Sequence, residues 1–454
     1  INIRKGVVVT MDTKAKVNYI IMDDTEDRSE ILLNQFSRNG VRHIGTATYE
    51  QTEEYDEPYL HGSVRFDYSL DELEEIAGKY GLNSNKNQFR SFVLQAVQYC
   101  GVRIGDEEAM RYVKTISGFE TGFRYYRIAG LLGTTRFTVR VVPSHWTGRA
   151  STNFVLQGSK IWIEDFLVGE LGAVFTGSSI YNLSYITENQ KEEMVLSINP
   201  FQKCAQHCKF CFKGTRAMLP TLRDSLINLS AEEIVRLLEV EYPELDYSGL
   251  TELVLLTARF GTLNQLLLYL EKLYKGIKII SKGAFDPNVH DGQRIKISTH
   301  LISTIEDMKK VEKFGVRRYI YPVEIFNDTL RQKYMSSQFY RDGNNKGDIS
   351  IDRVYKSLSD AKQVFGEEVE PVVILGIDNF DDTINGIAYL KKIGMSMLTH
   401  NIFRVYDSDQ MEMYHMSLEE IIETQILISQ NFESPFRQRI TKDLPKYHEK
   451  YRDI

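Results

Sequence analysis

The stretch that decides the fold is "MVLSINPFQKCAQHCKFC", residues 194–211. Its first five residues form a short apolar run typical of a buried strand, and the loop that follows carries Cys204, Cys208 and Cys211 at the spacing C-x3-C-x2-C. Thiolates this close on one loop can converge on a small metal cluster. A cubane [4Fe–4S] cluster takes one thiolate at each iron, so three cysteines leave one iron open to another ligand.

Outward from this loop, the chain alternates short apolar strands with amphipathic helices as far as residue 405. Ser230 and Glu233 form a capping box ahead of the first helix, and the apolar run 277–281 is ambiguous between strand and helix. The alternation predicts right-handed crossovers and a parallel sheet, open or curled into a partial barrel. Such sheets bind ligands at the carboxyl ends of their strands, where the cysteine loop lies. The expected strands are 194–198, 251–258, 294–301, 316–326, 370–378 and 395–403.

The part before residue 190 has a less regular pattern. Ser69 and Glu72 form a capping box at the start of one helix, and a second helix over residues 88–101 ends at Gly101. Strands rich in branched and aromatic residues are expected within 136–146 and 159–176. The sequence therefore predicts an N-terminal α+β domain over 1–190, a core over 191–405 and a C-terminal helical extension over 406–454.

Composition is that of a soluble globular protein with two or three domains: 454 residues, 42% hydrophobic and 26% charged. The net charge of -7 argues against nucleic acid as the main partner. Without a long apolar run or a secretory signal in the given sequence, we expect a cytoplasmic protein with no membrane partner. The clustered cysteines indicate a reducing compartment, and Cys100 is expected to be a small buried apolar residue.

A C-x3-C-x2-C loop after the first strand of a partial (β/α)6 parallel barrel resembles the radical S-adenosylmethionine (SAM) superfamily. The resemblance covers roughly residues 192–405 and follows a single-cluster, biotin-synthase-like core pattern. It implies a [4Fe–4S] cluster held by Cys204, Cys208 and Cys211, with S-adenosyl-L-methionine on the open iron. It also implies an oxygen-sensitive enzyme that cleaves S-adenosylmethionine reductively to a 5′-deoxyadenosyl radical, which abstracts hydrogen from a substrate.

The resemblance extends to residues that would bind the nucleoside. Phe210, just before the last cysteine, is expected beside the adenine. On the fifth strand, Gly376 and Ile377 match the family's G-x-I-x-G region, although Asp378 or Asn379 replaces its second glycine.

The same resemblance implies two charged contacts. Glu324, at the end of the fourth strand, matches a glutamate near the cofactor, and Arg353 matches an arginine that contacts the methionine carboxylate. A guanidinium can hold a carboxylate through two hydrogen bonds. Ser298, together with Thr299, could face the same cavity. The family's Gly-Gly-Glu at the second strand is missing, so backbone groups of Thr257 and Ala258 are expected in its place.

The absence of cysteine after Cys211 argues against auxiliary clusters and against RNA methylation through a C-terminal thiol. We therefore expect a small-molecule substrate in a biosynthetic reaction such as rearrangement, elimination, cyclisation or bond cleavage. A flavodoxin or ferredoxin is the expected electron donor. The N-terminal domain and the C-terminal segment are expected to shape a chamber that excludes water.

Two other readings stay open. An RNA-modifying enzyme of the same superfamily would need a basic surface, for which the arginines and aromatic residues within 123–140 are the candidates. A non-catalytic protein could instead use His207 with the three cysteines as a Cys3His zinc site. Against zinc, His207 directly precedes Cys208 on a tight loop.

Overall fold

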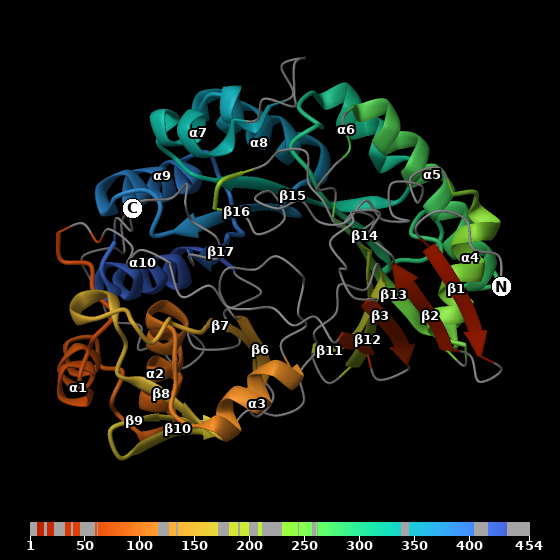
Figure 1. The fold of residues 1–454 in the computed structure, drawn as a ribbon. Helices are drawn as coiled ribbons and strands as arrows, with labels where there is room; N and C mark the ends of the chain where they lie inside the picture. Colours follow the sequence, from red (N-terminus) through yellow and green to blue (C-terminus); the bar gives the residue numbers. More distant parts are fainter. Residues whose placement is uncertain are drawn as a thin grey trace.

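The structure is a computed structural model, and Figure 1 shows its fold. It describes residues 7–12, 16–21, 32–37, 40–45, 60, 62–116, 127–132, 135–170, 181–188, 191–198, 208–210, 229–243, 245–256, 260, 262–336, 345–403 and 416–433.

A curled parallel sheet forms the core of the molecule and confirms the expected half-barrel. Six strands lie in sequence order with every neighbouring pair parallel among the described residues, and β11 (Tyr181–Glu188) adds an antiparallel strand at the β12 edge. The β11–β12 hairpin spans the expected domain limit at residue 190. The parallel strands are β12 (Lys191–Ile198), β13 (Leu250–Leu256), β14 (Arg294–Ser298), β15 (Val316–Glu324), β16 (Val369–Leu375) and β17 (Thr399–Ile402).

Helices cover the outer side of this sheet (Figure 1). Ser230 and Glu233 form the expected capping box of the first of them. The ambiguous run 277–281 is helical up to Ile280, because it continues the leucine-rich helix that begins at Leu263. The helices are α4 (Ala231–Glu241), α5 (Leu263–Ile280), α6 (Ile305–Glu312), α7 (Asp328–Met335), α8 (Ile351–Phe365) and α9 (Phe380–Lys392), with 3-10 turns η3 (Tyr247–Gly249) and η4 (Lys346–Asp348).

The two faces of the sheet differ in chemistry. Leu253, Ile297 and Tyr319 are fully buried on the helix side, where the Tyr319 ring stacks on Phe365 of α8 with centroids 5.8 Å apart. Alternate residues along a strand point to opposite faces, so Glu252 and Lys296 lie on the other face, 2.8 Å apart. Strand periodicity thus separates an apolar helix-facing side from a side that bears charges.

The N-terminal part contains its own helices and antiparallel strands. The capping box of Ser69 and Glu72 is present, and the second helix ends at Gly101 as expected. The expected strand regions 136–146 and 159–176 contain β7, β9 and β10, and residues 171–176 lie outside the described residues. The sequence analysis did not predict the sheet β1–β4. The elements are β1 (Val7–Asp12), β2 (Lys16–Ile21), β3 (Leu32–Ser37), β4 (Gly40–Gly45), α1 (Leu70–Lys79), α2 (Lys86–Cys100), β5 (Arg103–Ile104), α3 (Glu107–Ile116), β6 (Arg127–Leu132), β7 (Thr135–Arg140), η1 (Gly148–Ala150), β8 (Phe154–Gln157), β9 (Lys160–Ile163) and β10 (Phe166–Glu170).

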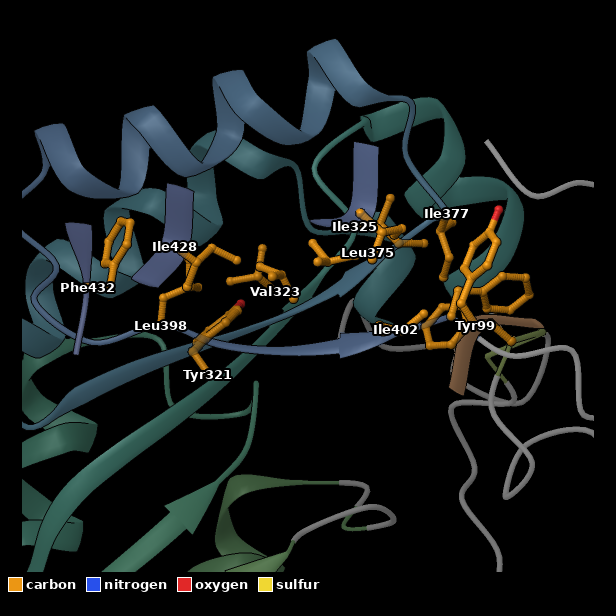
Figure 2. Packing of buried hydrophobic residues seen from close by; sticks show 14 of the residues in the cluster. Tyr99, Tyr321, Val323, Ile325, Leu375, Ile377, Leu398, Ile402, Ile428 and Phe432 are labelled. Atoms are coloured by element: carbon orange, nitrogen blue, oxygen red, sulfur yellow. The ribbon is translucent and has the colours of Figure 1, made fainter. Parts of the chain in front are cut away.

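Helix α10 (Leu418–Asn431) joins the N-terminal part to the half-barrel. On one side, the Tyr99 hydroxyl of α2 donates to the Met416 carbonyl at 2.8 Å. On the other side, the Leu398 N–H donates to the Glu433 carbonyl at 3.1 Å. Figure 2 shows one apolar cluster that runs from the ends of β15 and β16 to α10 and includes Tyr99. None of the described helices has the length and apolar character needed to cross a membrane.

Candidate functional site

The carboxyl ends of the parallel strands bring several of the expected residues to one edge of the sheet. Ser298 and Glu324 are the last residues of β14 and β15, and Gly376 directly follows β16. Thr257 and Ala258, at the end of β13, lie outside the described residues, as do Cys204 and Cys211. No group of three potential metal ligands occurs within the described residues.

The described part of the cysteine loop, residues 208–210, is hydrogen-bonded to helix α7. Cys208 and Phe210 are buried, and the Lys209 N–H between them donates to the Tyr334 carbonyl at 2.8 Å. The Tyr334 hydroxyl is buried and has no hydrogen-bond partner in the part of the chain that the structure describes. A buried hydroxyl without a partner is costly, so a polar group that reached this hydroxyl would be stabilised.

The chemistry of the loop fits a cluster. Three thiols in eight positions are soft ligands suited to iron–sulfur binding, and the described one, Cys208, is shielded from solvent. The donor set and the unpartnered Tyr334 hydroxyl are therefore compatible with a buried cofactor beside α7.

Glu324 has an unusual backbone conformation for a residue with a side chain. Its φ is 64°, in the left-handed region, and the register between β15 and β16 shifts between Pro322 and Glu324. Its Oε2 lies 2.6 Å from the Nζ of Lys346, which the sequence analysis did not single out. Strained residues of this kind persist where surrounding contacts hold them and are frequent at functional sites.

Arg331 fixes the chain around this position. The fully buried guanidinium donates to the carbonyls of Val323 and Ile325, both at 2.7 Å, and to those of Ile349 at 3.0 Å and Lys346 at 3.3 Å. One side chain therefore joins the end of β15 to the segment that carries Lys346.

Asp378 performs a similar task between β15 and β16. Its carboxylate accepts the N–H of Phe326 at 2.7 Å and the N–H of Asn327 at 3.0 Å. Burial raises the pKa of Asp378 to about 6, against the opposing effect of these two hydrogen bonds. Of the two residues that could replace the family glycine, Asp378 thus binds backbone N–H groups, and Asn379 is the N-cap of α9.

Gly376 and Ile377 occupy different environments at the same strand end. Gly376 has a φ of 101°, which favours glycine, and a Cβ added there would lie 3.4 Å from Cβ of Phe403 and 3.8 Å from Cδ1 of Ile421. Ile377 is fully buried in the apolar cluster of Figure 2.

The charge of Arg353 acts on Tyr321, as do the charges of Glu324 and Lys346. Burial raises the pKa of Tyr321, while the positive charges of Arg331, Lys346 and Arg353 oppose this rise. Arg353 itself is exposed at the start of α8, where its N–H donates to the Oγ of Ser350 at 3.4 Å.

The two polar residues at the end of β14 differ in exposure. Ser298 is partly exposed, whereas Thr299 is buried and its Oγ1 accepts the Leu301 N–H at 3.1 Å in a local turn. Thr299 also donates its N–H to the Ile320 carbonyl at 3.1 Å. Ser298 is thus more accessible to a ligand than Thr299.

Lys346, Arg331 and Tyr334 have no sequence signal that would have placed them here. Lys346 lies 22 positions after Glu324, and Arg331 is an arginine inside a short polar helix. Only the crossover from β15 to β16 brings them to the strand end.

The structure shows a parallel half-barrel, and in the sequence a three-cysteine loop follows its first parallel strand. Residues 198–379 match the family model described as "Radical SAM superfamily". The similarity to this superfamily is thus carried by a segment that makes up less than half of the chain. Members of this superfamily are enzymes that use a [4Fe–4S] cluster and S-adenosylmethionine, in agreement with the expected cofactors.

Several solved structures are similar to the chain at low identity. The hydrogenase maturase HydG from Carboxydothermus hydrogenoformans is 17% identical, with 53% of this chain and 52% of that chain covered and a TM-score of 0.38. Coproporphyrinogen III oxidase HemN from Escherichia coli is 14% identical, with 51% of each chain covered and a TM-score of 0.34. Streptococcus suis SuiB bound to S-adenosylmethionine is 13% identical, with 53% and 49% covered and a TM-score of 0.34. The chain spans about half the length of each of these proteins. No curated protein matches the sequence.

Proposed function

We propose that the protein is a radical SAM enzyme that abstracts hydrogen from a small biosynthetic molecule. The observation that carries the proposal is the position of the C-x3-C-x2-C loop, which directly follows the first parallel strand of the half-barrel within the matched segment. The outcome for the substrate is a rearrangement, elimination, cyclisation or bond cleavage.

Cys204, Cys208 and Cys211 are the proposed ligands of the cluster. When bound, the cluster supplies the electron that cleaves the S–C5′ bond of S-adenosylmethionine to give methionine and a 5′-deoxyadenosyl radical. The chain contributes attachment and shielding: Lys209 ties the loop to α7, and Cys208 is buried.

The proposed binding residues for S-adenosylmethionine surround the same strand ends. Arg353 binds the methionine carboxylate through its guanidinium, and Glu324 accepts hydrogen bonds from the ribose hydroxyls or the ammonium group. Backbone and side-chain contacts come from Phe210, Thr257, Ala258, Ser298, Gly376 and Ile377. Gly376 has no side chain, and its positive φ favours glycine at this position, which suits the close approach of a flat ring.

The division into residues 1–190, 191–405 and 406–454 is also part of the proposal. The N-terminal part and α10 close the substrate chamber from one side. The position of α10 supports this, because a Cβ added at Gly376 would lie 3.8 Å from Cδ1 of Ile421. A flavodoxin or ferredoxin delivers the electron, and the enzyme acts in the cytoplasm.

Anaerobic reconstitution tests the proposal. We expect about four irons per chain and formation of 5′-deoxyadenosine after reduction with dithionite in the presence of S-adenosylmethionine. Replacing Cys208 with Ala is expected to abolish both. The matched control is Cys100→Ala. Burial raises the pKa of the Cys100 thiol, so this thiol stays protonated and does not act as a metal ligand.

Two results contradict the proposal. Colourless protein with stoichiometric zinc supports the zinc-site reading instead. Iron retained in full by the Cys208→Ala variant would show that the cluster has other ligands.

A further inference from the structure

Glu324 is the central residue of a three-residue turn at the end of β15. The Ile325 N–H donates to the Val323 carbonyl at 2.8 Å, and the φ of Glu324 is 64°. A turn closed by a hydrogen bond between residues i and i+2, with positive φ at its centre, is the rare and strained form of the γ-turn. A residue with a side chain keeps such a conformation only where other contacts hold it.

One nitrogen of Arg331 binds both ends of this turn. Its Nη1 donates to the Val323 carbonyl and to the Ile325 carbonyl, each at 2.7 Å. The two carbonyl oxygens are therefore at most twice this distance apart, whereas an extended strand separates carbonyls two residues apart by about 6.6 Å. The two hydrogen bonds of Nη1 are thus incompatible with an extended backbone at Glu324.

The buried charge of Arg331 is compensated mainly by backbone carbonyls. Its ion pair with Asp328 is loose, because Nε lies 3.9 Å from Oδ1 and the Asp328 side chain is 48% exposed. The other hydrogen bonds of the guanidinium go to the carbonyls of Ile349 and Lys346. Burial of a charged group is costly unless hydrogen bonds compensate it. The guanidinium therefore holds backbone, and the Glu324 turn takes its two shortest hydrogen bonds.

The carboxylate of Glu324 has a different partner. Its Oε2 lies 2.6 Å from Nζ of Lys346. This ion pair acts at the end of the side chain, whereas the backbone conformation sets the direction in which the side chain leaves the strand end. The charge of Glu324 also acts on Arg331, so a test of the turn must separate the hydrogen bonds of Arg331 from its charge.

We propose that Arg331 is a positioning residue that holds the left-handed turn at Glu324 and so fixes where the Glu324 carboxylate meets its ligand. This inference rests on the proposed function, in which the ligand is the ribose or the ammonium group of S-adenosylmethionine. Arg331 acts through the backbone of Glu324 and need not contact the ligand.

Urea denaturation of the full chain tests the turn without any cofactor. We expect the ratio of folded to unfolded protein to be at least about fivefold higher for Glu324→Gly than for Glu324→Ala, because only glycine adopts positive φ without strain. Neither variant carries the carboxylate, so the charge of Arg331 does not enter this comparison. In an Arg331→Met background, the advantage of glycine should fall below about twofold, since the turn can relax. The same fall is expected for Arg331→Lys, which lacks the planar fork of donors and is the second variant if Arg331→Met does not fold.

Binding of S-adenosylmethionine to the reconstituted holoprotein, measured anaerobically by equilibrium dialysis, tests the positioning role. Arg331→Lys keeps the charge, and we expect it to weaken binding at least about fivefold with Glu324 in place and less than about twofold in a Glu324→Gly background. A purely structural role of Arg331 would give the same loss in both backgrounds.

The matched control is Arg317→Lys, near the other end of β15. Arg317 also donates to backbone carbonyls, those of Glu312, Val316 and Pro287. We expect Arg317→Lys to leave both the advantage of glycine at position 324 and the binding of S-adenosylmethionine within about twofold of their wild-type values.

Three outcomes overturn the inference: no advantage of glycine over alanine at position 324, an advantage that persists when Arg331 is replaced, or an equal loss of binding with and without the Glu324 side chain. Failure of the wild-type holoprotein to bind S-adenosylmethionine overturns the proposed function itself. The two failures are distinguishable, because the denaturation test of the turn needs no cofactor.

Discussion

The carboxylate of Asp378, after β16, accepts the backbone N–H of Phe326, after β15, at 2.7 Å. Burial raises the pKa of this carboxyl from 3.8 to about 6. The folded state thus holds the proton more tightly than the unfolded chain, so the stability contributed by Asp378 is full below pH 4 and is lost as the pH rises through 6.

We expect Asp378→Asn to remove this pH dependence. The difference in free energy of unfolding between wild type and variant should fall by on the order of 3 kcal/mol from pH 4 to pH 7, since one pKa unit corresponds to about 1.36 kcal/mol. Urea titrations at several pH values measure it. A constant difference across this range would contradict the assigned cause.

Arg331 should be among the positions of the half-barrel where a substitution lowers the free energy of unfolding most. Arg331→Met leaves buried carbonyls, including those of Val323 and Ile325, without their donor. We expect a loss of about 3–5 kcal/mol in the free energy of unfolding, in the range for removal of a buried charged partner. Chemical denaturation of the purified variant measures the loss.

The control for this prediction is Arg236→Met on the exposed side of α4. A surface substitution of this kind is expected to stay within about 0.5 kcal/mol of the wild type. If both variants lose the same stability, the hydrogen bonds of Arg331 are not the reason.

The regular part of the fold could be predicted because its signals are local. Caps such as Ser230 with Glu233, and strand runs such as 194–198, depend on neighbours a few residues away. The run 277–281 stayed ambiguous because a short apolar segment suits a buried helix as well as a strand.

The interactions of the candidate site depend on the tertiary fold and escaped the sequence analysis. Glu324 could be placed at a strand end from the element order, but its partner Lys346 comes from a turn beyond α7. In the sequence, Asp378 was one of two residues that could replace a family glycine. In the structure, its carboxylate accepts hydrogen bonds from two backbone N–H groups. Sequence separation carries no information about such contacts.

Gly376 and Gly366 form a matched pair for testing the adenine contact. Both have positive φ, 101° and 60°, and an added Cβ at Gly366 meets no atom within 4 Å. We expect Gly376→Ala and Gly366→Ala each to cost about 1–3 kcal/mol from backbone strain. Only Gly376→Ala should also weaken binding of S-adenosylmethionine, measured by equilibrium dialysis. Equal binding of S-adenosylmethionine by both variants would show that Gly376 does not line the binding pocket.

Helix α10 should depend on the N-terminal part for its stability. Tyr99→Phe removes the donor to the buried Met416 carbonyl, and a lost hydrogen bond of this kind costs about 1 kcal/mol. Amide hydrogen exchange at the start of α10 should therefore become about fivefold faster, because a free energy of 1 kcal/mol corresponds to that factor at 25 °C. Tyr80→Phe is the control, since its hydroxyl lies 3.4 Å from the partly exposed Glu423 and should matter less. Because Ile421 of this helix packs above Gly376, faster exchange in Tyr99→Phe alone would mean that this contact with α2 helps to hold the wall of the proposed cofactor pocket. Unchanged exchange would mean that the Tyr99 hydrogen bond does not stabilise α10.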